Sequence, residues 1–225
     1  MKNKSFEKGG LTFFDVETSH CDYWFSQEID FYDLENITFS KGDVIIDIGA
    51  HIGTTTLPTC KTNPDISCIG FEANLNNYNN LIKNISENGI KNFTPNFCGV
   101  YSKTGQILES RFRSDNSGAT SFFNENVNDN SNYIPTISLD DIFKIYKLEN
   151  IKVFKIDCEG AEYDILYNSE KIKNIEIEYM YLEAHDYPLQ DQDPKDLIRY
   201  IEEELNVKHF KYTIADCEWW SINEK

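Results

Sequence analysis

The residues best placed to do chemistry in this chain are acidic side chains that directly follow short apolar runs. Three of them follow runs that end at positions 46, 71 and 156: Asp47, Glu72 and Asp157. Buried parallel strands have such apolar sequences, and open α/β sheets bind ligands outside the carboxyl ends of their strands. The pattern therefore predicts an α/β fold whose ligand site is built from the ends of several parallel strands.

The first of these places is the stretch 44–53, VIIDIGAHIG, which is typical of a strand, a tight turn and the start of a helix. Glycine lets a backbone approach a ligand closely, because it has no Cβ. Gly49, Ala50, His51 and Gly53 are therefore candidate contacts of a nucleoside cofactor. The alternative is an ordinary turn between a strand and a helix, without a ligand.

Two acids near this turn indicate which cofactor it would take. A pyrophosphate cradle has glycine where this chain has Asp47, whose charge would repel phosphate and attract a cationic ligand. Glu72 lies 25 positions later, where a doubly wound sheet places the carboxylate that binds ribose hydroxyls. Together the two acids favour S-adenosylmethionine over NAD.

A second stretch, 152–162, reads KVFKIDCEGAE and brings three carboxylates to the end of a predicted strand. Asp157 is the best candidate for contact with the cofactor or the acceptor, and Glu159 is a candidate for placing the acceptor. Glu162 falls in the first turn of the helix expected after Gly160, where a negative charge is favourable by itself.

A third strand end carries the candidate general base. The predicted strand 178–184 is followed by His185, and histidine can accept a proton from a hydroxyl near neutral pH. The alternative is a histidine held by a neighbouring carboxylate in a structural role. Asp157, Glu183 and Asp186 are hard oxygen ligands that suit a divalent cation, but their spacing does not demand one, so no metal is assigned.

The elements that must position these residues follow from hydrophobic periodicity. The patterns predict strands at 44–48, 67–71, 92–100 and 178–184. They predict helices at 53–62, 75–88 and 194–205. Segments 106–113 and 119–123 are expected to form an antiparallel insertion, with 124–132 as a surface loop or a lid over the acceptor. Strands at 209–215 and 218–223 are expected to form a hairpin that gives the sheet an antiparallel edge.

Composition limits the domain organisation and the partners. The chain has 225 residues, 40% of them hydrophobic, which is enough for one sizeable core. We expect a domain over 41–225 and an N-terminal extension over 1–40 that packs on it and lines an acceptor pocket or fills the core. The net charge of −17 repels phosphate backbones and excludes nucleic acid as a favoured partner. A small-molecule or saccharide acceptor is compatible with it.

The sequence also bears on location and redox state. No apolar run approaches the roughly 18 residues of a membrane span, and the first ten residues lack an apolar core of a signal peptide. We therefore expect a soluble, cytoplasmic protein. The six cysteines show no close pairing and are expected to be free thiols: Cys21, Cys60, Cys68, Cys98, Cys158 and Cys217.

Several motifs taken together resemble the FkbM family of S-adenosylmethionine-dependent methyltransferases. The matching residues are DIGAHIG at 47–53, Phe71 with Glu72, SKTG at 102–105, SLDD at 138–141 and KIDCEGAE at 155–162. The resemblance implies a Rossmann-like class I fold with a mostly parallel sheet of seven strands. It also implies O-methylation of hydroxyls on sugars, glycans or natural products.

The same resemblance implies roles for individual residues. Asp47, Gly49 and Ala50 would hold the methionine end of the cofactor, Glu72 its ribose, and Asp157 would lie close to the transferred methyl. Methyl transfer would then be an in-line displacement by a hydroxyl oxygen. Two other function classes remain open, a binding module that keeps the cofactor fold without catalysis and an NAD-dependent oxidoreductase. The sequence does not name the acceptor or the oligomeric state.

Overall fold

The computed structural model describes residues 4–15, 32–112, 118, 120–122, 131–186 and 192–216. Its main sheet has six strands, in the spatial order β12 (Val207–Asp216), β11 (Glu176–Asp186), β10 (Asn150–Ile156), β3 (Val44–Ile48), β4 (Ser67–Glu72) and β5 (Phe93–Phe97). All five strand pairs within it are parallel. The predicted α/β class is confirmed.

The sheet differs from the prediction at its β12 edge. The described residues form six strands rather than seven, and β12 pairs parallel with β11, so the predicted antiparallel edge is wrong for this segment. The reason is the helix α6 (Pro194–Glu204), which carries the chain back along the sheet and allows a parallel return. The second strand of the expected hairpin, 218–223, lies outside the described residues.

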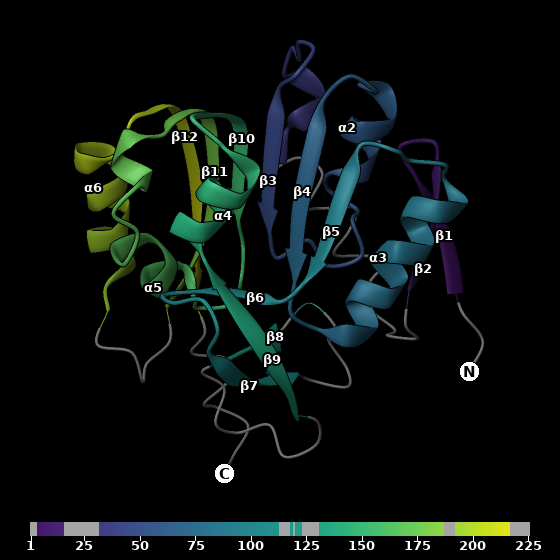
Figure 1. The fold of residues 1–225 in the computed structure, drawn as a ribbon. Helices are drawn as coiled ribbons and strands as arrows, with labels where there is room; N and C mark the ends of the chain where they lie inside the picture. Colours follow the sequence, from purple (N-terminus) through teal and green to yellow (C-terminus); the bar gives the residue numbers. More distant parts are fainter. Residues whose placement is uncertain are drawn as a thin grey trace.

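Helices cover both faces of the main sheet (Figure 1). One face packs against α4 (Leu139–Tyr146), α5 (Glu162–Tyr167) and α6, and the other against α2 (Leu57–Thr62) and α3 (Leu75–Glu87). Consecutive residues of β3 serve the two cores, because side chains alternate along a strand: Ile46 packs in the first and Ile45 in the second. Two short 3-10 helices complete the described helices, η1 (Leu34–Asn36) and η2 (Ile172–Asn174).

The N-terminal hairpin, β1 (Lys4–Lys8) and β2 (Leu11–Asp15), is held on α3 by two asparagines. Asn88 accepts from the Thr12 N–H at 3.0 Å and donates to the Thr12 carbonyl at 2.8 Å. Asn84 makes the same pair of bonds to Phe14, at 2.8 and 3.2 Å. Each amide side chain therefore bonds β2 as a neighbouring strand would. Residues 16–31 of the expected N-terminal extension lie outside the described part.

A second sheet, built by the insertion, lies near the carboxyl ends of the main strands (Figure 1). It contains β6 (Gly99–Tyr101), β9 (Ser131–Ser138), β7 (Ile107–Phe112) and β8 (Thr120–Ser121), in that order. The expected antiparallel strands are confirmed as β7 and β8. The expected strand 92–100 divides into β5 and β6, because β6 leaves the main sheet to pair with β9. Most of the expected loop or lid, 124–132, lies outside the described residues.

Further expectations can be compared with the described chain. Ser138 caps α4, since its side chain accepts from the Asp141 N–H. Cys60, Cys68, Cys98 and Cys158 are free, while Cys21 and Cys217 lie outside the described residues. Among the described helices, none has the length and apolar character needed to cross a membrane.

Candidate active site at the carboxyl edge of the sheet

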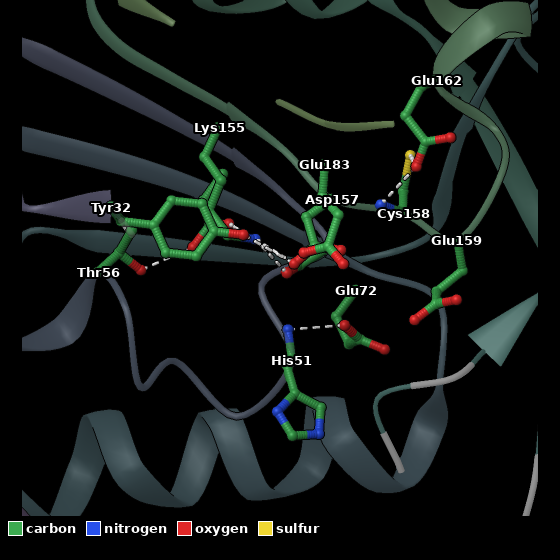
Figure 2. Close-up of polar contacts among 12 residues, drawn as sticks. Tyr32, His51, Thr56, Glu72, Lys155, Asp157, Cys158, Glu159, Glu162 and Glu183 are labelled. Carbon is green, nitrogen blue, oxygen red and sulfur yellow. Dashed lines mark hydrogen bonds and ion pairs between the residues drawn. The ribbon is translucent and has the colours of Figure 1, made fainter. Parts of the chain in front are cut away.

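The predicted site residues come together where the strand order changes direction. From β3 the chain continues to β4 on one side, whereas β10 pairs with β3 on the other and leads on to β11. Such a switch point is where open α/β sheets bind their ligands. Figure 2 shows the side chains of Glu72, Asp157 and Glu183 gathered at this edge, with Lys155 reaching toward Asp157.

The glycine turn after β3 is shaped by its neighbours. The N–H groups of Gly49 and Ala50 both donate to the Phe71 carbonyl, at 3.0 and 2.9 Å. Gly49 has a φ of +81°, and a Cβ there would lie 1.7 Å from the Asp157 carbonyl oxygen. Glycine is therefore required at this position for β3 and β10 to end side by side. Whether Gly49 and Ala50 also contact a cofactor stays a prediction.

The helix after this turn starts later than predicted. The expected helix 53–62 begins at Leu57, because His51 and Gly53 have left-handed φ values of 50° and 88°. These conformations are incompatible with a right-handed helix. A Cβ on Gly53 would lie 2.6 Å from the Leu57 side chain, so this glycine also permits close packing.

Glu72 joins two loops at the end of β4. Its Oε2 accepts from the His51 N–H at 2.8 Å, and its Oε1 accepts from the Asn74 N–H at 2.8 Å. Burial is the main cause that raises the pKa of this carboxyl to about 7, against the opposing effect of the two amide bonds. Glu72 thus fixes the loops that follow β3 and β4.

Asp47 is turned into the protein rather than toward a ligand. Its side chain is 1% exposed, and its Oδ2 accepts from the Thr56 hydroxyl at 2.7 Å. Its Oδ1 lies 3.2 Å from Lys155 Nζ. Burial raises the pKa of Asp47, and Lys155 opposes that rise. The sequence predicted that Asp47 attracts a cationic ligand directly, but its carboxylate is not exposed to one.

Lys155 is the main site residue that sequence reasoning missed. Its Nζ donates to the Gly49 carbonyl at 2.9 Å and lies 3.6 Å from Asp157 Oδ2, in addition to its contact with Asp47. A signal was present, because a lysine between Phe154 and Ile156 in a buried strand needs an acidic partner. The sequence did not indicate which acid pairs with Lys155.

Asp157, which follows β10, is more accessible than Asp47 in the neighbouring strand β3. Its side chain is 24% exposed, and its Oδ2 accepts from the Tyr32 hydroxyl at 2.9 Å. Burial raises the pKa of Asp157, but Lys155, His185 and Tyr32 lower it, and the net direction is downward. Tyr32 was also missed, since a partner 125 positions away leaves no local pattern.

His185 is enclosed by carboxylates. Its Nδ1 lies 2.9 Å from Glu162 Oε1, and its Nε2 lies 3.5 Å from Glu159 Oε2 and 3.9 Å from Glu183 Oε1. Burial alone would lower the pKa of His185, but Glu159 and Glu162 raise it well above its ordinary value. Carboxylates beside both ring nitrogens favour the protonated imidazole, which has no lone pair for a hydroxyl proton. The geometry therefore favours the structural alternative over a general base.

Glu162 does more than favour a helix N-terminus. Its Oε1 accepts from the backbone N–H groups of Cys158 and Gly160, at 3.0 and 3.2 Å, and so closes the loop after β10. The same oxygen faces His185. Glu162 therefore ties the loop after β10 to the end of β11.

The carboxylates near His185 form a group that differs from the expected one. Asp157 repels Glu183, and this repulsion together with burial raises the pKa of Glu183 to about 8. Asp157, Glu183 and His185 each place a possible metal-ligand atom within 4.8 Å of the others. Asp186, which the sequence grouped with the two acids, is exposed, and His185 takes its place.

The insertion reaches both sides of the site through β8. The Asn74 side chain donates to the Thr120 hydroxyl at 3.1 Å, and the Ser121 hydroxyl donates to the Glu159 carbonyl at 2.7 Å. Glu159 itself has a left-handed φ of 56°. A non-glycine residue in this conformation is strained, so the bond from Ser121 helps to hold Glu159 beside His185.

Comparisons with known proteins give one extensive match and several partial ones. The methyltransferase FkbM domain model matches residues 47–212. No curated protein matches the chain. Among solved structures, TYW2 of M. jannaschii in complex with AdoMet is 21% identical with a TM-score of 0.33, over 42% of either chain.

Two further solved structures are similar over a comparable part of the chain. TYW2 of P. horikoshii in complex with MeSAdo is 13% identical with a TM-score of 0.34, over 43% of this chain and 36% of that one. Trm5b of Pyrococcus abyssi is 14% identical with a TM-score of 0.31, over 44% and 30%. The matched segment thus spans less than half of each of these structures.

Proposed function

Because the chain belongs to the FkbM methyltransferase family, we propose that it transfers a methyl group to a hydroxyl oxygen of a sugar, glycan or small natural product. Membership in this family agrees with S-adenosylmethionine as the predicted cofactor. The observation that carries the proposal is the meeting of the family's two acidic motifs, 47–53 and 155–162, at one edge of the sheet.

The chemistry of the side chains at this edge fits a cationic cofactor. Asp157, Glu159 and Glu183 are partly exposed carboxylates, and they suit the ammonium and sulfonium groups of S-adenosylmethionine. Lys155 is buried among acceptors and is not available to a pyrophosphate. These charges support S-adenosylmethionine over the NAD-dependent alternative.

We assign the cofactor contacts accordingly. Glu72 would accept from the ribose hydroxyls, and Asp157 would face the methionine end. Gly49, Ala50, His51 and Gly53 would form the turn beneath the cofactor. Asp47 is a positioning residue, since it acts through Lys155 on the Gly49 carbonyl.

The bound cofactor supplies an already activated methyl group on a sulfonium, so the chain has to orient the acceptor and receive its proton. Positioning of this kind contributes a large part of catalysis in two-substrate reactions. Asp157, Glu159 and Glu183 are the groups that an acceptor hydroxyl would reach, and Asp157 or Glu159 would receive its proton. His185, which the sequence nominated as general base, is assigned instead to holding Glu159 and Glu183 in place.

The first test is a calorimetric titration of the full chain with S-adenosylmethionine and S-adenosylhomocysteine. We expect micromolar binding, about −8 kcal/mol, that is weakened at least ~10-fold in Glu72→Ala. Glu87→Ala is the matched control, because Glu87 is exposed on α3. Absence of binding to the folded wild type would contradict the cofactor assignment.

A second measurement separates an enzyme from a non-catalytic binding module. Formation of S-adenosylhomocysteine is followed with a panel of saccharides and hydroxylated small molecules. Turnover that depends on a hydroxyl acceptor would support O-methylation. Tight cofactor binding without turnover on any hydroxyl, amine or carboxyl acceptor would favour the binding module.

A further inference from the structure

We propose that a divalent transition-metal ion binds at the carboxyl ends of β10 and β11, held by Asp157, Glu183 and His185. The possible ligand atoms of these three side chains all lie within 4.8 Å of one another. The set combines one imidazole nitrogen with two carboxylates. Metal binding at this place goes beyond methyl transfer and does not require it.

The backbone places the three residues together. Ile156, the last residue of β10, pairs with Leu182 of β11 in the parallel ladder. The residues that follow them, Asp157 and Glu183, therefore come side by side. Residues 183 and 185 point to the same face of β11, because side chains alternate along a strand. The arrangement therefore follows from strand register rather than from flexible side chains meeting on a surface.

His185 is oriented as metal-binding histidines usually are. Its Nδ1 faces the fully buried Glu162 carboxylate at 2.9 Å, and Glu162 Oε1 also accepts from the Cys158 N–H. Such a carboxylate fixes the proton on Nδ1 and directs Nε2 toward the ligand site. Here Nε2 points to Glu159 and Glu183, at 3.5 and 3.9 Å. A metal ion would take the place of the second imidazole proton at Nε2.

The local charge also suits a cation. Glu159 and Glu183 face Nε2 of one imidazole, and Asp157 lies within 4.8 Å of Glu183 and His185 by their possible ligand atoms. Lys155, which lies 3.6 Å from Asp157, is shared with Asp47 and the Gly49 carbonyl. A divalent ion between Asp157 and Glu183 would convert their repulsion into shared coordination.

The ligand set indicates which ion and what it would do. Imidazole together with carboxylates suits Mn²⁺, Fe²⁺, Co²⁺ or Zn²⁺, whereas Ca²⁺ and Mg²⁺ prefer oxygen ligands throughout. Three protein ligands leave coordination positions open, as in catalytic sites. If the proposed function holds, on which this role rests, a coordinated acceptor hydroxyl would lose its proton more easily.

The test uses Mn²⁺ as the probe and needs no cofactor. The purified full chain is treated with a chelator, exchanged into buffer and titrated with Mn²⁺, and free Mn²⁺ is measured by electron paramagnetic resonance. We expect one ion per chain, and at least ~10-fold weaker binding in Glu183→Gln. Glu178→Gln is the matched control on the same strand, because the two side chains are 34% and 35% exposed.

The outcomes separate the ion from the proposed function. Weakening in Glu183→Gln but not in Glu178→Gln supports the site. Equal affinity in the wild type and Glu183→Gln, or no binding, overturns it. If circular dichroism shows that Glu183→Gln is unfolded, Asp157→Asn takes its place with the same criteria. Titration of the metal-free chain with S-adenosylhomocysteine tests the cofactor separately, so loss of one proposal leaves the other standing.

Discussion

Two carboxylates at the active-site edge, Glu72 and Asp157, are stabilised in different ways. Glu72 ends β4 and accepts hydrogen bonds from neutral backbone amides, at 2.8 Å each. Asp157 follows β10 and lies 3.6 Å from the Lys155 ammonium, with the Tyr32 hydroxyl at 2.9 Å. The two groups therefore occupy similar places in the fold but have different electrostatic partners.

The difference shows what a nearby cation adds to a carboxylate. Burial raises the pKa of Glu72 to about 7, although two amides donate to it. Burial also acts to raise the pKa of Asp157, but the charges of Lys155 and His185 outweigh it, and the pKa of that carboxyl is lowered. Amides thus orient a carboxylate, whereas nearby cations keep it charged. Glu72 should therefore titrate near neutrality, and Asp157 should not.

The largest expected effect comes from removing the positive charge of Lys155. Lys155→Met leaves the buried Asp47 without its ion pair and removes the ammonium 3.6 Å from Asp157. An uncompensated buried charge typically costs ~3–5 kcal/mol, so we expect a loss of that size in the free energy of unfolding, measured by urea denaturation.

Two further variants sharpen this test. Lys152→Met is the matched control on the same strand, because Lys152 pairs with the partly exposed Glu178 at 2.7 Å and should cost no more than about 1 kcal/mol. The double variant Lys155→Met with Asp47→Asn should recover part of the lost stability. Equal losses in Lys155→Met and Lys152→Met would show that the buried lysine does not act through charge.

The pH dependence of Glu72 should give the next largest effect. Its pKa is about 7 in the folded protein and near 4.5 ordinarily, so between these values the folded chain keeps a proton that the unfolded chain has lost. Glu72 therefore contributes a fall in stability of about 3 kcal/mol as pH rises through this window. Urea denaturation between pH 4.5 and 8 measures the slope.

The contribution of Glu72 is isolated by difference. Glu72→Gln cannot ionise, so the difference in stability between wild type and variant should change by the same amount across the window. Glu87→Gln, on the exposed side of α3, should keep the wild-type slope. Parallel profiles for wild type and Glu72→Gln would mean that Glu72 is ionised in the folded protein well below neutral pH.

The features around Asp47 and Glu72 were predictable because their determinants are local in sequence. The apolar runs before Asp47 and Glu72 predicted β3 and β4 within one residue of their observed ends. The resemblance then added the expected fold and cofactor. The left-handed conformation of His51 was not predicted, and it delays the helix to Leu57.

The Asp157 side was less predictable because its partners are distant in sequence. Tyr32 reaches Asp157 across 125 positions, and Lys155 Nζ reaches the Gly49 carbonyl across 106. Likewise, the direction of β12 depends on how α6 packs rather than on the β12 sequence. Residue types indicated chemistry at each strand end, but only the fold determines which charges meet there.

The smallest expected effect is that of Glu162→Gln, at a residue that combines both kinds of partner. Glu162→Gln keeps a carbonyl oxygen that can still accept from Cys158, Gly160 and His185, so what is lost is the negative charge. We expect a cost of about 1 kcal/mol in urea denaturation, and about 3 kcal/mol for Glu162→Ala, which removes the acceptor altogether. If the Gln and Ala variants cost the same, charge rather than amide binding holds this loop, and the distinction drawn from Glu72 and Asp157 would not extend to Glu162.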